Sequence, residues 1–142
     1  MQRSDRARTA EPVATDRILE VRDALAGLAV HRHVVDREPV AAIAGEVDIS
    51  NVDRIAASLT SFSNLALGLV VDLREVDYLD SAAVSLLHDL AMRLRQRAQR
   101  LIVVCPPGSP PRDVLELTAL TAHTPVLDEL APAIAMLAAP DD

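Results

Sequence analysis

The sequence predicts a buried strand followed by an amphipathic helix between residues 67 and 97, and this junction indicates the fold class. Leu67 to Leu73 reads LGLVVDL, a short aliphatic run suited to a strand covered on both faces. From Ala83 onward the apolar side chains recur at helical spacing, and polar side chains occupy the opposite side. The change of pattern predicts a strand-to-helix turn close to residue 80.

A serine stands in that turn, next to an aspartate. We expect Ser81 to be the helix N-cap, whose hydroxyl accepts a backbone hydrogen bond worth about 1 kcal/mol. A phosphoryl group there would gain roughly 0.3–1 kcal/mol from the positive helix end. It would also place about −1.5 to −2 charges beside Asp80. From the residues alone, a structural cap and a phosphoacceptor are both open.

Composition indicates one globular domain with an aliphatic core. Of the 142 residues, 50% are hydrophobic and 25% are charged, and Phe62 and Tyr78 are the only aromatic ones. We expect a flexible arm at residues 1–15, the domain at 16–138 and a short tail at 139–142.

Charge and residue spacing argue against several classes of function. The net charge of −7 and the scattered arginines disfavour direct nucleic-acid binding. Cys105 is alone, the histidines lack metal-binding spacing and the glycines are far apart, so we expect no disulfide, metal or cofactor. Residues 1–16 lack the apolar segment of a signal peptide and no stretch is as long as a membrane span, so we expect a cytoplasmic protein.

Periodicity predicts the remaining elements. Turn residues at 36–39 separate two apolar stretches and indicate a β-hairpin, and Ser50 or Asn51 is expected to cap the helix that follows. The alternation of strands and helices predicts a single α/β domain with a mostly parallel sheet of four to five strands, an antiparallel edge and three to four helices. Strands are expected at 29–36, 40–44, 67–73, 101–105 and 124–127, and helices at 51–64, 81–97, 111–120 and 128–137. The apolar spacing at 16–28 indicates a short helix, although a strand could begin anywhere after Leu25.

The order of elements, the GEVD turn at 45–48 and the segment DLREVDYLDSAAV resemble the STAS domain of anti-sigma-factor antagonists. The resemblance covers residues 28 to 138. In that family, an anti-sigma factor that is also a kinase phosphorylates the serine that follows the aspartate at the strand-to-helix junction, and Ser81 matches it. The unmodified antagonist binds the anti-sigma factor, and the phosphorylated one releases it. The resemblance implies a binding protein without enzymatic activity that frees a sigma factor for transcription.

The implied partner surface surrounds the serine. Ala83 stands where the family usually has glycine, and we expect its methyl group to affect how a partner approaches. The polar candidates also have structural explanations. Asp48 could simply close a turn, Asp80 could oppose the positive end of the helix dipole, and Ser85 could be an ordinary exposed serine on a helix. The surface comprises Asp48, Asp80, Ser81, Ala82, Ala83 and Ser85.

Two other functions are alternatives to this one. STAS proteins also serve as adaptor subunits of lipid-transport ATPase complexes, and in that case Ser81 would matter only for packing. A serine hydrolase is disfavoured because the GxSxG elbow is missing and His88, seven residues from Ser81, is too far along the helix to act as its base. We expect no catalytic residue, and the oligomeric state stays open.

Overall fold

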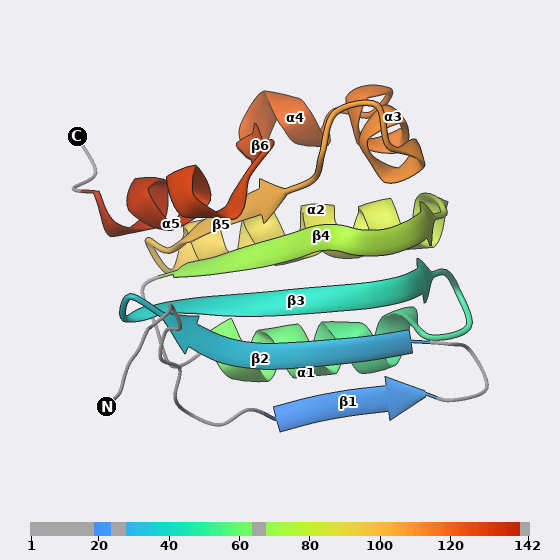
Figure 1. Ribbon diagram of the computed structural model, residues 1–142, viewed down its shortest axis with the longest axis horizontal. Helices are drawn as coiled ribbons and strands as arrows, with labels where there is room; N and C mark the ends of the chain where they lie inside the picture. The colour runs from blue at the N-terminus through green and yellow to red at the C-terminus, as the bar shows by residue number, and fades with distance from the viewer. Residues whose placement is uncertain (1–18, 24–27, 64–67, 140–142) are drawn as a thin grey trace, which may run out of the picture.

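In the computed structural model, the protein folds into a six-stranded sheet with helices against both faces (Figure 1). The structure describes residues 19–23, 28–63 and 68–139. The predicted arm and tail fall almost entirely outside these ranges. In chain order the elements are β1 (Leu19–Asp23), β2 (Leu28–Val35), β3 (Glu38–Val47), α1 (Val52–Ser63), β4 (Gly68–Leu79), α2 (Ser81–Gln96), β5 (Arg100–Val104), α3 (Pro110–Glu116), α4 (Leu120–His123), β6 (Val126–Leu127) and α5 (Leu130–Ala138).

The strands lie in the sheet in the same order as in the chain. β1, β2 and β3 pair antiparallel, whereas β3 to β6 pair parallel. Helices connect the parallel strands, because consecutive strands that pair parallel need a crossover connection. The predicted single α/β domain with a mostly parallel sheet and an antiparallel edge is therefore confirmed.

The helix predicted over residues 16–28 is wrong. Residues 19–23 of that segment form the edge strand β1, in which Val21 pairs with Val30 of β2, and Leu28 begins β2 itself. The helical spacing of the apolar residues is a local signal, and pairing with β2 overrides it.

The predicted hairpin is confirmed and turns through two residues. Asp36 and Arg37 have φ angles of 51° and 73°, the left-handed values that a tight hairpin turn needs at both central positions. β2 and β3 then pair from Val35 and Glu38 to Ala29 and Ala44.

Two aliphatic clusters cover the two faces of the sheet. The larger lies beneath α1 and α2 and includes Ile55, Leu73 and Leu94. The smaller lies beneath α5 and includes Val70 and Ile102. Consecutive residues of β4 point to opposite faces, so this strand is buried on both sides, as its aliphatic run predicted.

The helix predicted over residues 111–120 is interrupted. α3 ends at Glu116 and α4 begins at Leu120. The Thr118 hydroxyl donates to the Leu115 carbonyl (2.8 Å) and accepts from the Leu120 amide (3.3 Å), so a side chain takes over helical backbone groups. The strand predicted at 124–127 is shorter, and the last helix begins later than expected.

Candidate functional site

Ser81 is the first residue of α2 and is exposed to solvent. β4 ends at Leu79, so only Asp80 separates the buried strand from the helix. The predicted strand-to-helix turn is therefore present, and the hydroxyl that it carries lies on the protein surface.

Asp80, rather than Ser81, caps the helix. Its backbone is extended (φ −105°, ψ −175°), and its Oδ1 accepts a hydrogen bond from the Ala83 amide at 3.0 Å. The prediction that Ser81 is the N-cap was wrong by one position, because aspartate is as good a capping residue and it occupies the last extended position. The capping bond of α2 consequently does not use the Ser81 hydroxyl.

Asp80 also joins the loop that carries Ser81 to the loop after β3. Its Oδ2 accepts from the Ile49 amide at 3.1 Å, and its own amide donates to the Val47 carbonyl at 3.2 Å. The two loops meet because β3 and β4 are parallel neighbours, whose carboxyl ends share one edge of the sheet. One carboxylate thus fixes the relative position of both loops.

Asp48 lies in the loop that Asp80 holds, on the same rim as Ser81. Its Oδ1 accepts hydrogen bonds from the amide (2.9 Å) and the hydroxyl of Ser50. These bonds lower the pKa of the Asp48 carboxyl below its ordinary value. Asp48 therefore closes a turn, which was its structural alternative, and this turn lies at the same end of the sheet as Ser81.

Asn51 supports this loop from beneath, a role that the sequence did not reveal. Its side chain is buried, accepts from the Asp48 amide at 3.1 Å and donates to the Glu46 carbonyl at 2.9 Å. The sequence predicts that Ser50 or Asn51 caps α1, but the side-chain oxygen of Asn51 accepts from the amide of Asp48, which precedes it in the chain. The signal available was the preference of asparagine for turns.

The Ala83 side chain is not part of the surface. It is 1% exposed and belongs to the larger core cluster, so its methyl group faces the core, and its expected effect on the approach of a partner stays a prediction. The helical period explains the result, because Ala83 shares a face with Leu87, Leu90 and Leu94. Ser85, by contrast, is exposed.

A groove between α1 and α2 begins beside Ser81. It has a volume of about 360 Å³, and both Ala82 and Ser85 line it. Ile49, which is 78% exposed, stands at the groove on the loop that Asp80 holds. Sequence reasoning missed Ile49, because a single isoleucine in a polar turn does not indicate that the residue lies at a groove. The remaining lining residues are Val52, Asp53, Ala56, Thr60, Leu86, Asp89, Leu90 and Arg93.

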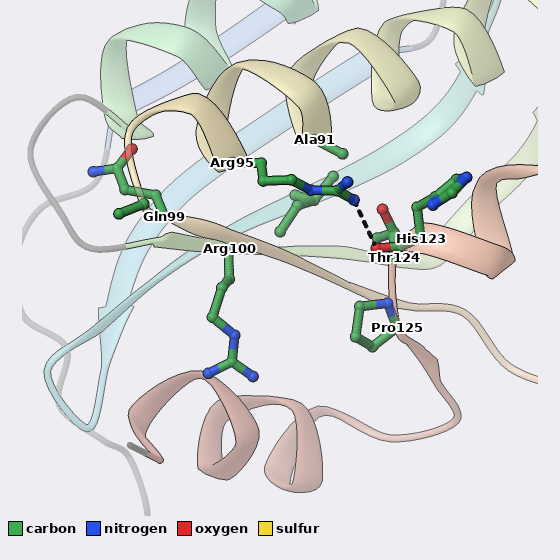
Figure 2. A pocket seen from close by; sticks show the side chains of 9 residues that line it. Ala91, Arg95, Gln99, Arg100, His123, Thr124 and Pro125 are labelled. Atoms are coloured by element: carbon green, nitrogen blue, oxygen red, sulfur yellow. Dashed lines mark hydrogen bonds between the residues drawn. The ribbon is translucent and has the colours of Figure 1, made fainter. Parts of the chain in front are cut away.

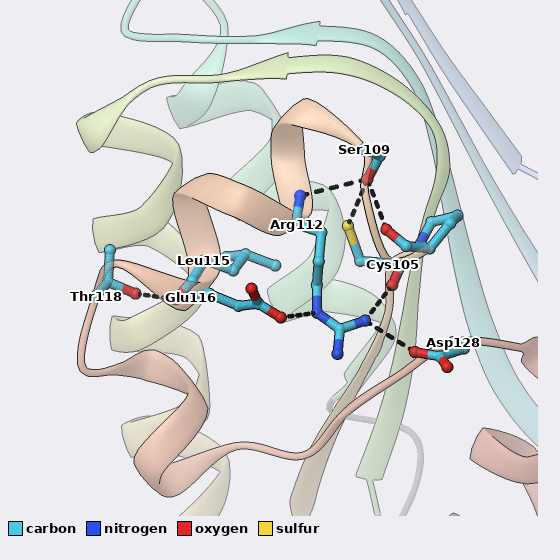
Figure 3. Close-up of polar contacts among 8 residues, drawn as sticks. Cys105, Ser109, Arg112, Leu115, Glu116, Thr118 and Asp128 are labelled. Carbon is cyan, nitrogen blue, oxygen red and sulfur yellow. Dashed lines mark hydrogen bonds and ion pairs between the residues drawn. The ribbon is translucent and has the colours of Figure 1, made fainter.

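The serine at the start of α3, unlike Ser81, is a helix cap and shows what a structural serine looks like in this fold (Figure 3). Ser109 caps α3: its hydroxyl donates to the Pro106 carbonyl at 2.8 Å and accepts from the Arg112 amide at 3.4 Å. Arg112 in turn donates hydrogen bonds to the Cys105 carbonyl and to the Asp128 carboxylate. Burial raises the pKa of the Cys105 thiol above its ordinary value. These groups tie β5, α3 and the segment before α5 together.

A hollow near the start of β5 contains several basic side chains, but they do not converge (Figure 2). Arg95 crosses to the His123 carbonyl at 3.4 Å, whereas Arg100 extends toward α5 and donates to the Ala139 carbonyl at 3.5 Å. The hollow therefore lacks the focused charge of an anion site.

Across residues 19–23, 28–63 and 68–139, no group of three or more His, Cys, Asp or Glu could hold a metal ion, and no helix could cross a membrane.

Comparison with known proteins gives a family and a set of similar folds. A family model described as the STAS domain matches residues 30–133. An anti-sigma factor antagonist from Mycobacterium paratuberculosis is similar, with 21% identity, coverage of 78% of this chain and 93% of that chain, and a TM-score of 0.70. SpoIIAA, an anti-sigma factor antagonist, is similar in its unphosphorylated form, with 22% identity, 80% and 99% coverage and a TM-score of 0.64.

The phosphorylated form of SpoIIAA from Bacillus also resembles the chain, with 24% identity, coverage of 75% of this chain and 97% of that chain, and a TM-score of 0.57. At these levels of identity, the solved structures show a shared fold. Among curated proteins, none matches the sequence.

Proposed function

The chain belongs to the STAS-domain family, and from that membership we propose that it is an anti-sigma-factor antagonist controlled by phosphorylation of Ser81. It binds an anti-sigma factor with kinase activity and so releases a sigma factor for transcription. This role belongs in the cytoplasm and requires neither chemistry by the chain nor contact with DNA. The similar solved structures, described as anti-sigma factor antagonists, support the general role.

One observation carries the proposal: Ser81 is exposed at the start of α2 while Asp80 makes the capping bond. A kinase can modify an exposed hydroxyl without breaking that bond. Ser109 differs, because its hydroxyl holds the start of α3. The fold therefore tolerates a phosphate at Ser81.

The switch works through charge. A phosphoserine adds about −1.5 to −2 charges at pH 7. At Ser81 this charge lies next to Asp80, and Asp48 stands on the same rim. A partner that packs there must desolvate the added charge, and each 1.4 kcal/mol lost lowers affinity about tenfold. The unmodified and phosphorylated chains therefore differ in affinity without any change of fold.

The test combines phosphorylation with binding. Purified protein is incubated with ATP and each kinase-type anti-sigma factor of the same organism, and its intact mass and its affinity are measured. We expect one added phosphate on the wild type and none on Ser81→Ala. We also expect Ser81→Glu to bind the anti-sigma factor at least tenfold more weakly.

Ser61→Glu is the matched control, because Ser61 is an exposed helical serine on α1. It should bind like the wild type. Unchanged mass with every kinase, together with equal affinity of Ser81→Glu, would contradict the proposal. Co-purification with a lipid-transport ATPase in place of an anti-sigma factor would favour the adaptor role.

A further inference from the structure

We infer that the α1–α2 groove receives an apolar side chain of the anti-sigma factor, carried on a segment with basic residues on either side. The inference rests on the proposed function and adds to it the chemistry of the partner. The groove supplies an apolar floor, and acidic residues on its border select the charge of the segment that enters.

The floor of the groove is aliphatic and is kept open by small side chains. Ala56 of α1 and Ala82 of α2 line it together with Val52, Leu86 and Leu90. Leu86 and Leu90 are 9% and 4% exposed, so they form the base of the groove and contact the core below. An aliphatic side chain that enters would be removed from water, which favours binding.

The groove continues the surface that carries Ser81. Ala82 follows Ser81 directly, and Ile49 is held beside it by the Asp80 carboxylate. Ile49 is 78% exposed and lines the groove, so it extends the apolar contact when a partner covers it. A single partner can therefore contact the serine and fill the groove.

The charges around the groove favour a basic partner. Asp53 and Asp89 line it and are both exposed. The positive charge of Arg93 lies at the Thr60 side, where its Nη1 bonds the Thr60 hydroxyl at 3.2 Å. The net charge of −7 acts in the same direction over a longer range. A segment with Arg or Lys near its apolar side chain complements this border.

The first test fills the groove. Ala56→Leu places a larger side chain in it, and the probe is the purified anti-sigma factor that the Ser81 experiment identifies. We expect at least tenfold weaker binding. Ala57→Leu is the matched control, because Ala57 is the next residue of α1, is exposed and does not line the groove; it should bind like the wild type. Thermal unfolding of each variant checks that the fold is intact.

The second test changes only the border and so avoids the core. Asp89→Arg should slow association at least tenfold at low salt and weaken the dependence of the association rate on salt. Asp113→Arg, on the exposed side of α3, makes the same charge change away from the groove and should alter the rate much less.

The outcomes separate this inference from the proposed function. If Ser81→Glu weakens binding while Asp89→Arg and a folded Ala56→Leu bind like the wild type, the groove is not the contact and only the inference fails. If Ala56→Leu does not fold, Asp89→Arg alone decides. If the wild type binds no anti-sigma factor, both the function and the inference fail.

Discussion

Asp80 shows at the scale of one residue how a side chain can serve two loops. One carboxylate oxygen caps α2, and the other holds the Ile49 amide, which lies 31 positions earlier in the chain. The presence of an aspartate beside the serine was evident in the sequence, and so was its suitability for a helix start. Its second bond was not, because the sequence does not say which loop lies next to it.

Replacing Asp80 tests both bonds together. Asp80→Ala removes the acceptors for the Ala83 and Ile49 amides, and we expect the free energy of unfolding to fall by about 1–2 kcal/mol. Asp80→Asn keeps one side-chain oxygen and should lose less. Urea denaturation measures the change, with the exposed Asp77→Ala as control. Equal stability of Asp80→Ala and Asp77→Ala would mean that neither bond contributes.

At the scale of elements, local sequence patterns correctly predicted those helices and strands whose formation depends only on residues close together in the chain. The β2–β3 hairpin, α1 and α2 follow from turn residues and from helical spacing. β1 and the break between α3 and α4 did not follow, because a neighbouring strand decides the first and the Thr118 hydroxyl decides the second. The helical spacing of apolar residues cannot show that a neighbouring strand or a side-chain hydroxyl will bind the same backbone groups.

The hairpin turn offers a test at this scale. Arg37 has a φ of 73°, a left-handed value that costs a non-glycine residue about 1–2 kcal/mol. Glycine adopts it freely, although it loses about 0.5–1 kcal/mol of backbone entropy on folding. We therefore expect Arg37→Gly to raise the free energy of unfolding by about 0.5–1 kcal/mol, measured in urea. Arg37→Ala keeps the strained backbone and should show no gain; a lower stability of Arg37→Gly than of Arg37→Ala would contradict this reason.

At the scale of the whole molecule, close packing of α5 against the sheet depends on a glycine. A Cβ atom on Gly68 would lie 2.6 Å from the Arg100 carbonyl oxygen and 2.6 Å from the Leu137 Cδ1 atom. β4, β5 and α5 can therefore meet at this point only if residue 68 has no side chain. The aliphatic run around Gly68 predicted a buried strand, but it did not predict which helix would cover it.

Gly68→Ala should consequently destabilise the protein by about 1–3 kcal/mol, because β5 or α5 must move to admit the methyl group. Leu137→Ala removes one of the two contacts, so the double variant should be more stable than the sum of the single effects. Thermal and urea unfolding of all four proteins give this coupling. Strict additivity would mean that the methyl group does not meet Leu137.

The sequence by itself determined the strand-to-helix turn, the aliphatic core, the hairpin and the α/β class, because each depends on residues close together in the chain. It also placed a serine at the start of α2 and supported the STAS resemblance. Only the tertiary structure decided that the Asp80 carboxylate also binds the Ile49 amide and that Ile49 and the α1–α2 groove lie beside Ser81. Those features arise where segments distant in sequence meet, and periodicity carries no information about which distant groups will be neighbours.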